Sequence, residues 1–423
     1  MNRRMVLKAL ASATGTLLIP IGRSGWAAAL PQEQKPGRRL IVLMLRGAVD
    51  GLNVVVPYAD SAYYRARSSI AIARPGNEGG ALDLDGHFGL NSALSSLMPY
   101  WKNGTLAFVH ASGSPNPSRS HFEAQDFMET GTPGVTSTPD GWMNRLLGTM
   151  SGPHSDVRGI SLGDALPRIV SGPVSVATVS LGQHATQLKP MDRDLVASAF
   201  DQMYAGKDAL KQAYQNGRNS RTEMLYDLGD KGTPDDAMEE AKVADGGAPL
   251  PRGFQIEAAQ LAQIMRRDSK IRMAFLALGG WDTHVRQGNA NGQLAGHLQP
   301  LGDGLALMAQ QLGPLFSESV IVVMSEFGRT VHENGSGGTD HGHGNVMWVM
   351  GGNVGGSKVY GDWPGLEEAA LYQRRDLAVT TDFRSVLALV AERHLQLSES
   401  QLAQVFPEAP AKSNDKLAGI LKT

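Results

Sequence analysis

Five apolar runs stand out in the pattern of hydrophobic and polar positions along the chain. Residues 40–45, 273–278 and 320–324 are apolar throughout, and residues 106–109 and 346–350 are weaker candidates of the same kind. A run without polar alternation is typical of a central strand in a parallel sheet, because both faces of such a strand are covered. We therefore expect these runs to be buried strands.

Apolar residues spaced three and four positions apart predict amphipathic helices between the runs. This spacing occurs at 294–312, before the run at 320–324, and at 256–265, before the run at 273–278. Strands that alternate with helices indicate an α/β domain with a largely parallel central sheet and helices on both faces.

Residues 195–250 differ from the rest of the chain because they are polar and contain few large apolar side chains. We expect a peripheral helical insertion there, with a loose stretch at 246–253, within a single domain that covers residues 30–423. No later stretch is apolar enough over about 20 residues to predict a membrane span.

Residues 1–29 have the layout of a secretory signal. A charged start that contains Arg3 and Arg4 is followed by an apolar run at 9–21 and by small residues at 27–29. The paired arginines favour a twin-arginine signal over a general secretory signal or an uncleaved anchor. We expect a periplasmic or secreted protein that has the twin-arginine export machinery as a partner.

The amino-acid composition excludes several kinds of nucleophile, metal ligand and binding partner. The 423 residues include no cysteine, so disulfides and thiolate nucleophiles are excluded. A nucleophile must be a hydroxyl, a carboxylate or a metal-bound water, and a metal site must use histidine and carboxylate ligands. The net charge of −2 gives no basic field for nucleic acid.

Acidic residues and a histidine follow the three strongest runs. Asp50 comes after the first run, Asp282 and His284 come after the second, and Glu326 comes after the third. Because ligands bind outside the carboxyl ends of strands in open parallel sheets, we expect these residues to share one site. For Asp50 a cap of the next helix is an equal alternative.

Two short motifs have spacing that suits a metal ion. Asp282 and His284 are two residues apart, so they point to the same side of an extended segment. Asp340, His341 and His343 repeat this arrangement in a loop with glycines on both sides of His343. Imidazole and carboxylate are ligands for zinc, manganese or iron, so we favour a metal site over helix caps and ordinary polar loop residues.

A fourth segment places hydroxyl groups at the expected start of a helix near Ser120. The hydroxyl there is either a cap or a nucleophile, since a helix N-terminus also stabilises negative charge. Ser118 is the alternative nucleophile, and Pro117 favours Ser120 because it keeps the preceding chain extended. Arg119 and Arg46 are candidates for binding an oxyanion.

Together these motifs resemble the signature blocks of an uncharacterised bacterial family, the domain-of-unknown-function family numbered fifteen-oh-one. The blocks lie, in matching order, at 46–53, 118–125, 279–284, 325–330 and 338–344. The resemblance covers nearly the whole mature chain, and members of the family often carry twin-arginine signals. The family is grouped with alkaline phosphatases, sulfatases and phosphoglycerate mutases, which implies an alkaline-phosphatase-like fold.

The resemblance also implies residue roles. Proteins of that superfamily hold one or two metal ions over a serine, threonine or modified cysteine nucleophile. Position by position, Asp50 resembles the metal ligand after the first strand and Ser120 the nucleophile. Asp282 and His284 resemble the ligands of one metal, and His341 resembles a late histidine ligand.

One block departs from the family pattern. Glu326-Phe327-Gly328 stands where many relatives have Asp-His-Gly. An imidazole ligand of a second metal is therefore missing unless Asp340 or His343 replaces it. The resemblance implies one or two divalent ions, with zinc as the first expectation.

The expected function is metal-dependent hydrolysis of a small phosphate or sulfate ester by an exported enzyme. The alternative is an exported protein that keeps the fold and an incomplete metal site for binding or assembly, because a fold does not guarantee a working site.

Overall fold

The computed structural model describes residues 37–150, 158–163, 165–180, 244–408 and 415–422. The expected signal at 1–29 and most of the expected insertion at 195–250 lie outside the described residues.

The centre of the fold is a sheet built on β1 (Arg39–Leu45), which pairs in parallel with both β8 (Met273–Leu278) and β9 (Ser319–Ser325). The described strands of this sheet follow the order β11-β5-β10-β9-β1-β8-β6-β7. The five predicted runs are confirmed as strands, the other two being β5 (Leu106–Gly113) and β10 (Asn345–Gly351).

The sheet is largely parallel, as expected. Only β10, among the described strands of this sheet, runs against its neighbours β9 and β5. The remaining strands are short. They are β6 (Gly159–Leu162), β7 (Ala177–Val179), β11 (Lys358–Tyr360) and β12 (Thr381–Asp382), and a separate small sheet contains β2 (Val55–Val56), β3 (Leu82–Asp83) and β4 (Gly89–Leu90).

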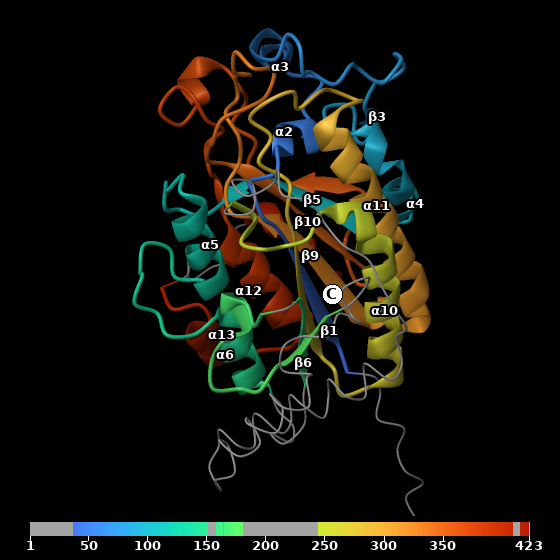
Figure 1. Cartoon of the computed structure of the whole chain (residues 1–423), viewed down its shortest axis with the longest axis vertical. Helices are drawn as coiled ribbons and strands as arrows, with labels where there is room; N and C mark the ends of the chain where they lie inside the picture. The colour runs from blue at the N-terminus through green and yellow to red at the C-terminus, as the bar shows by residue number, and fades with distance from the viewer. Residues whose placement is uncertain (1–36, 151–157, 164, 181–243, 409–414, 423) are drawn as a thin grey trace, which may run out of the picture. The chain divides into compact units, whose positions relative to one another are not determined.

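Helices cover both faces of the sheet, which confirms the α/β expectation (Figure 1). One face packs against α4 (Met98–Lys102), α10 (Phe254–Arg267) and α11 (Gln293–Leu312). The other face packs against α5 (His121–Thr130), α6 (Trp142–Thr149), α12 (Phe383–Arg393) and α13 (Glu399–Val405). Two short helices, α2 (Gly51–Val54) and α3 (Ser61–Ala66), follow β1.

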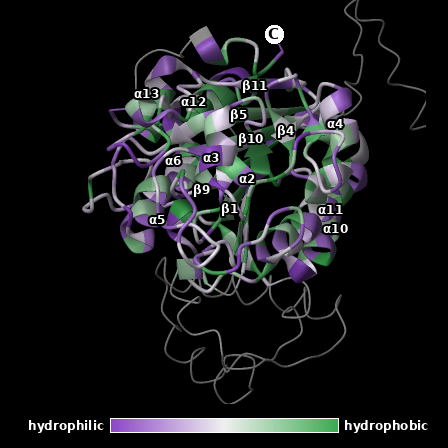
Figure 2. Ribbon diagram, turned by 90° about the horizontal axis from the view of Figure 1, so that it is seen from above, coloured by the Kyte–Doolittle hydropathy of each residue, from purple (hydrophilic) through white to green (hydrophobic). Residues whose placement is uncertain are grey.

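Burial explains why β1 lacks polar alternation. Ile41, Leu43 and Leu45 join the core on the α10–α11 side, while Leu40, Val42 and Met44 join the opposite core. The hydrophobic residues of the strands therefore lie between two groups of helices (Figure 2). None of the helices within the described ranges is long and apolar enough to cross a membrane.

Two histidines outside the candidate site, His110 and His394, are fully buried. His110 Nε2 donates to the Val55 carbonyl at 2.9 Å, and its Nδ1 accepts from the Ala111 amide at 3.1 Å. This pairing holds the imidazole neutral. Burial lowers the pKa of both His110 and His394 to about 4.

The protein should therefore lose stability in mild acid. Above pH 6.5 both imidazoles are neutral in the folded and unfolded chain, whereas between 6.5 and about 4 only the unfolded chain binds the extra protons. Each histidine should lower the free energy of unfolding by about 1.4 kcal/mol per pH unit across that window. Urea unfolding measured from pH 7 to 4.5 should show that the free energy of unfolding depends less on pH in His110→Gln than in the parent protein. An equal pH dependence in the two proteins would contradict this.

Candidate metal centre

The strand register brings the candidate loops to one edge of the sheet. Leu45 at the end of β1 lies opposite both Leu278 and Ser325, the last residues of β8 and β9. The segments that begin at residues 46, 279 and 326 therefore leave the sheet side by side, as the sequence predicts.

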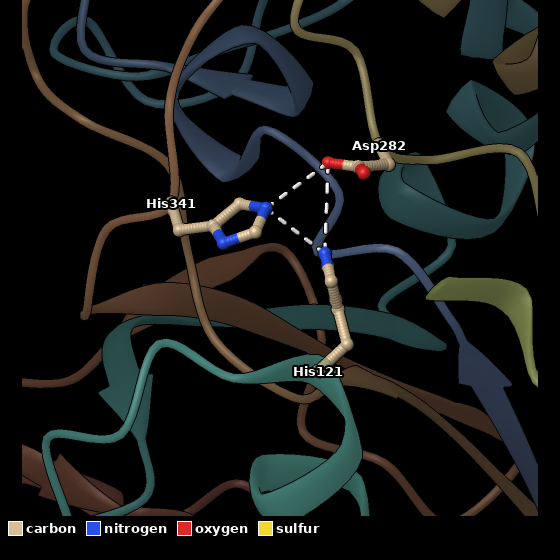
Figure 3. A group of neighbouring side chains, drawn as sticks. All are labelled: His121, Asp282 and His341. Carbon is tan, nitrogen blue, oxygen red and sulfur yellow. Dashed lines mark hydrogen bonds and ion pairs between the residues drawn. The ribbon is translucent and has the colours of Figure 1, made fainter. Parts of the chain in front are cut away.

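Four side chains converge above this edge. The Nε2 atom of His341 lies 3.0 Å from the Nε2 atoms of both His121 and His284. Asp282 Oδ1 lies 3.0 Å from His284 Nε2, 3.3 Å from His341 Nε2 and 3.6 Å from His121 Nε2. Figure 3 shows three of these groups, His121, Asp282 and His341, pointing toward one another.

The other ring nitrogen of each imidazole faces an oxygen that can only accept a hydrogen bond. These oxygens are Glu326 Oε1 at 2.8 Å from His121, the Arg119 carbonyl at 2.9 Å from His341, and Asp340 Oδ1 at 3.1 Å from His284. If each Nδ1 carries the proton, three Nε2 lone pairs point at a common position. Lone pairs 3.0 Å apart repel one another, and either protons on the imidazoles or a bound cation would remove this repulsion.

The donors fit a metal ion. His121, Asp282 and His341 form a group that could hold one, and His284 adds a fourth donor beside two of them. Ligand atoms about 2.1 Å from a tetrahedral zinc ion lie roughly 3.4 Å apart, close to the separations here. Nitrogen and carboxylate donors also suit iron or manganese. Histidine ligands that donate their second N–H to an oxygen are the usual arrangement in metal sites.

The electrostatic field of the site favours positive charge. Burial raises the pKa of Asp282, but hydrogen bonds from the histidines and the charge of Arg329 outweigh this and hold the pKa well below its usual range. Burial lowers the pKa of His121, yet Asp282 and Glu326 outweigh it and raise the pKa to about 9. The same anionic groups would stabilise a metal ion.

The structure brings together five of the residues that the sequence predicts for this site. Asp282, His284 and His341 supply donor atoms, while Glu326 and Asp340 orient imidazoles from behind. Glu326 is fully buried and also accepts bonds from the Gly47 amide and Gln125 Nε2. Its place behind His121 differs from the ligand role that we expected.

Two expected ligands lie elsewhere. The Asp50 carboxylate is buried against the Arg67 guanidinium, at 2.5 and 3.0 Å, and also accepts from Gln287 Nε2 at 2.6 Å. The His343 ring packs against the Tyr372 ring, with centroids 4.7 Å apart and planes tilted by 38°, and burial lowers the pKa of His343. Neither residue belongs to the group of side chains that converges, and a ligand role remains a prediction for each.

Both expected anion-binding arginines already have acidic partners. Arg46 pairs with Glu129 at 2.6 Å, and Arg119 pairs with Asp376 at 2.6 Å. Their charges are therefore largely neutralised inside the protein. A role in binding substrate remains a prediction for each.

Two residues near the site were not singled out from the sequence. His121 directly follows the candidate nucleophile. Its partner Asp282 lies 161 positions later in the sequence, so no local motif contains both residues. Asp245 belongs to the stretch that we expected to be peripheral, yet it is 6% exposed and accepts from the Gly280 amide at 2.8 Å. Burial raises the pKa of Asp245 to about 6.

The serine alternatives differ in their contacts. Helix α5 begins at His121 with Ser120 as its N-cap residue, which confirms the predicted helix start, but the Ser120 hydroxyl makes no capping bond. Ser118 Oγ instead donates to Glu123 and accepts from the Ser120 amide, at 2.7 and 3.3 Å. The Ser120 side chain is exposed, and within the described contacts neither serine hydroxyl accepts from an amide of the first turn of α5.

Sequence comparison places the chain in a family. The model of the family described as "Protein of unknown function (DUF1501)" matches residues 108–406. The chain belongs to this family. The resemblance inferred from the motifs is thus confirmed, and a comparison with curated proteins gives no significant match.

The fold has distant similarity to solved structures. Ps i-CgsB in complex with k-i-k-neocarrahexaose is 11% identical, with 86% of this chain and 74% of that chain covered and a TM-score of 0.36. The zinc complex of the C-terminal periplasmic domain of EcEptC from Escherichia coli is 9% identical over 75% and 74%, with a TM-score of 0.33. A protein in the alkaline phosphatase superfamily from Vibrio parahaemolyticus is 10% identical over 76% and 62%, with a TM-score of 0.35.

A metal ion should stabilise the fold through this centre. Zinc added to metal-free protein at 100 times its Kd should raise the free energy of unfolding by about 2.7 kcal/mol, because only the folded chain assembles the donors. Thermal unfolding should show this shift in the parent protein and in His332→Ala, which removes an exposed imidazole outside the cluster. The shift should shrink strongly in His341→Ala, and an undiminished shift would contradict the assignment.

Proposed function

We propose that the chain is a metal-dependent hydrolase whose ion is held by His121, Asp282, His284 and His341. The observation that carries this proposal is the convergence of three imidazole Nε2 atoms and one carboxylate oxygen within 3.0–3.6 Å of their neighbours. Zinc is the ion that we expect first, because these nitrogen and oxygen donors suit it.

We propose small phosphate or sulfate esters as substrates. The motif blocks and their order support this class through their resemblance to the alkaline phosphatase and sulfatase superfamily. The position of Ser120 supports it independently, since its hydroxyl precedes the ten-residue helix α5 and adjoins His121 in the chain. The N-terminus of a helix favours the negative charge of an alkoxide or of a bound ester.

In the reaction, the Ser120 oxygen would form a bond to phosphorus or sulfur as the ester bond to the alcohol oxygen breaks, and the serine proton would pass through solvent to the leaving alcohol oxygen. Water would then cleave the serine ester and release phosphate or sulfate. A bound metal ion would supply a lowered pKa for the attacking oxygen and charge stabilisation for the leaving oxygen. Glu326 would hold His121 by accepting from Nδ1, and Arg329 would hold Asp282 through its carboxylate.

A metal-binding protein without catalysis is the second candidate, and Phe327 is the observation that favours it. This buried ring packs at 4.9 Å from the His121 ring and 5.2 Å from the His341 ring, measured between centroids. It lies where many relatives of the resembled superfamily have a further histidine ligand. Binding or assembly would need only the single cluster.

Ser120→Ala separates the two candidates. If Ser120 is the nucleophile, hydrolysis of p-nitrophenyl phosphate or sulfate should fall by at least 100-fold, because the covalent step is lost. Zinc content and thermal stability should stay at the parent level, since the hydroxyl makes no capping bond. Ser118→Ala is the matched control and should keep activity.

The outcomes are distinct. Retained activity in Ser120→Ala would contradict the nucleophile assignment. A parent protein that binds zinc but cleaves none of a panel of phosphate monoesters, phosphate diesters and sulfate esters would support the binding protein instead.

We also propose that the protein is exported by the twin-arginine route to the periplasm or beyond. The charged, apolar and small-residue order of residues 1–29 supports this. The double variant Arg3→Lys, Arg4→Lys should accumulate in the cytoplasm, as cell fractionation would show, while the parent leaves it. Export of the variant at the parent level would point to the general secretory route.

A further inference from the structure

A buried glutamine connects the two loops that carry most of the metal donors. Gln287 is fully buried, and its Oε1 accepts from Thr283 Oγ1 at 2.7 Å and from Thr339 Oγ1 at 3.0 Å. Thr283 lies between Asp282 and His284, and Thr339 lies two residues before His341. One amide oxygen thus holds a residue from each loop.

The orientation of this amide is fixed by Asp50. Gln287 Nε2 donates to Asp50 Oδ2 at 2.6 Å, and an ionised carboxylate can only accept, so Oε1 must face the threonines. Asp50 is in turn held by the fully buried guanidinium of Arg67. Arg67 also donates to the carbonyls of Thr330 and Val331, which extends the network to the loop after β9.

The two loops approach each other closely at this point. The Thr339 amide donates to the Thr283 carbonyl at 3.1 Å, and the Gln287 amide donates to the Gly337 carbonyl at 2.9 Å. A Cβ atom at Gly338 would lie only 2.3 Å from the His284 carbonyl oxygen, so no larger residue fits there. Small shifts of either loop would therefore change the distances between donor atoms.

We propose that Gln287, oriented by the Asp50–Arg67 ion pair, is a positioning residue that sets the spacing of the metal donors. It reaches the donors only through Thr283 and Thr339. The inference rests on the metal centre of the proposed function and assigns Asp50 a part in it without direct coordination. Loss of a residue that orients metal ligands typically lowers metal affinity 10- to 100-fold.

Metal affinity measured by competition with a chromophoric zinc chelator tests this directly. Gln287→Met keeps the length of the side chain but removes all three hydrogen bonds, and its zinc affinity should fall 10- to 100-fold. Thr283→Val and Thr339→Val each remove one of the two bonds to Oε1 at nearly constant volume. Each should lower the affinity by less than Gln287→Met does, which gives a graded series.

Asn144→Leu is the matched control for loss of a buried amide. Asn144 on α6 is fully buried and makes three hydrogen bonds of 2.8–3.0 Å to Val170 and Val174, none in the donor loops. It should lower the melting temperature while leaving zinc affinity at the parent level.

The results of these affinity measurements distinguish the positioning role from the proposed metal centre. Parent-level affinity in Gln287→Met and in both threonine variants would overturn the positioning role and leave the proposed function intact. An equal loss of affinity in Asn144→Leu would also overturn it, because general loosening would then explain the effect. A parent protein that binds no zinc, manganese or iron would overturn this inference together with the proposed metal centre.

Discussion

The parallel pairing of β1 with both β8 and β9 is the constraint on which the site depends. The pairing aligns the last residues of the three strands, so the following loops start side by side at one edge of the sheet. Hydrogen bonds alone would permit other registers. The side chains of β1 fill a core on each face, and the close packing of both cores accompanies this register. Burial of apolar side chains in the sheet thus determines where polar side chains meet above it.

Hydrogen-bond acceptors behind the imidazoles orient the donor atoms of the site. Glu326, Asp340 and the Arg119 carbonyl each take the Nδ1 side of an imidazole, which turns the Nε2 atoms toward Asp282. Asp282 in turn is held by Arg329, whose guanidinium also binds the carbonyls of Gly47, Ala48 and Thr339. These bonds tie all three loops to one another. Buried charges of this kind are costly unless they are paired, and here each described carboxylate at the centre has a partner.

Much of the fold follows from local sequence, whereas the site follows only in part. The strand at 40–45 and the helix at 294–312 each show their hydrophobic pattern within a short stretch of sequence, so this pattern alone predicts them. Asp282, His284 and His341 were found because each lies just beyond a strand or within a glycine loop. His121 was missed because its partners are more than 160 residues away in sequence, and tertiary packing alone brings them together. The contacts of Asp50 could not be predicted for a related reason, since nothing in its local sequence reveals that Arg67 pairs with its carboxylate.

Phe327 limits the number of donor atoms in the cluster. An imidazole at that position would have offered another donor nitrogen beside His121 and His341, but a phenyl ring offers none and excludes water from that side. Asp340 is bound to His284 and Asn334, and His343 is turned toward Tyr372, so neither replaces the missing donor. Within the described residues, one group of three or more ligating side chains remains. The described residues therefore offer one candidate cluster, and we propose a single ion for it.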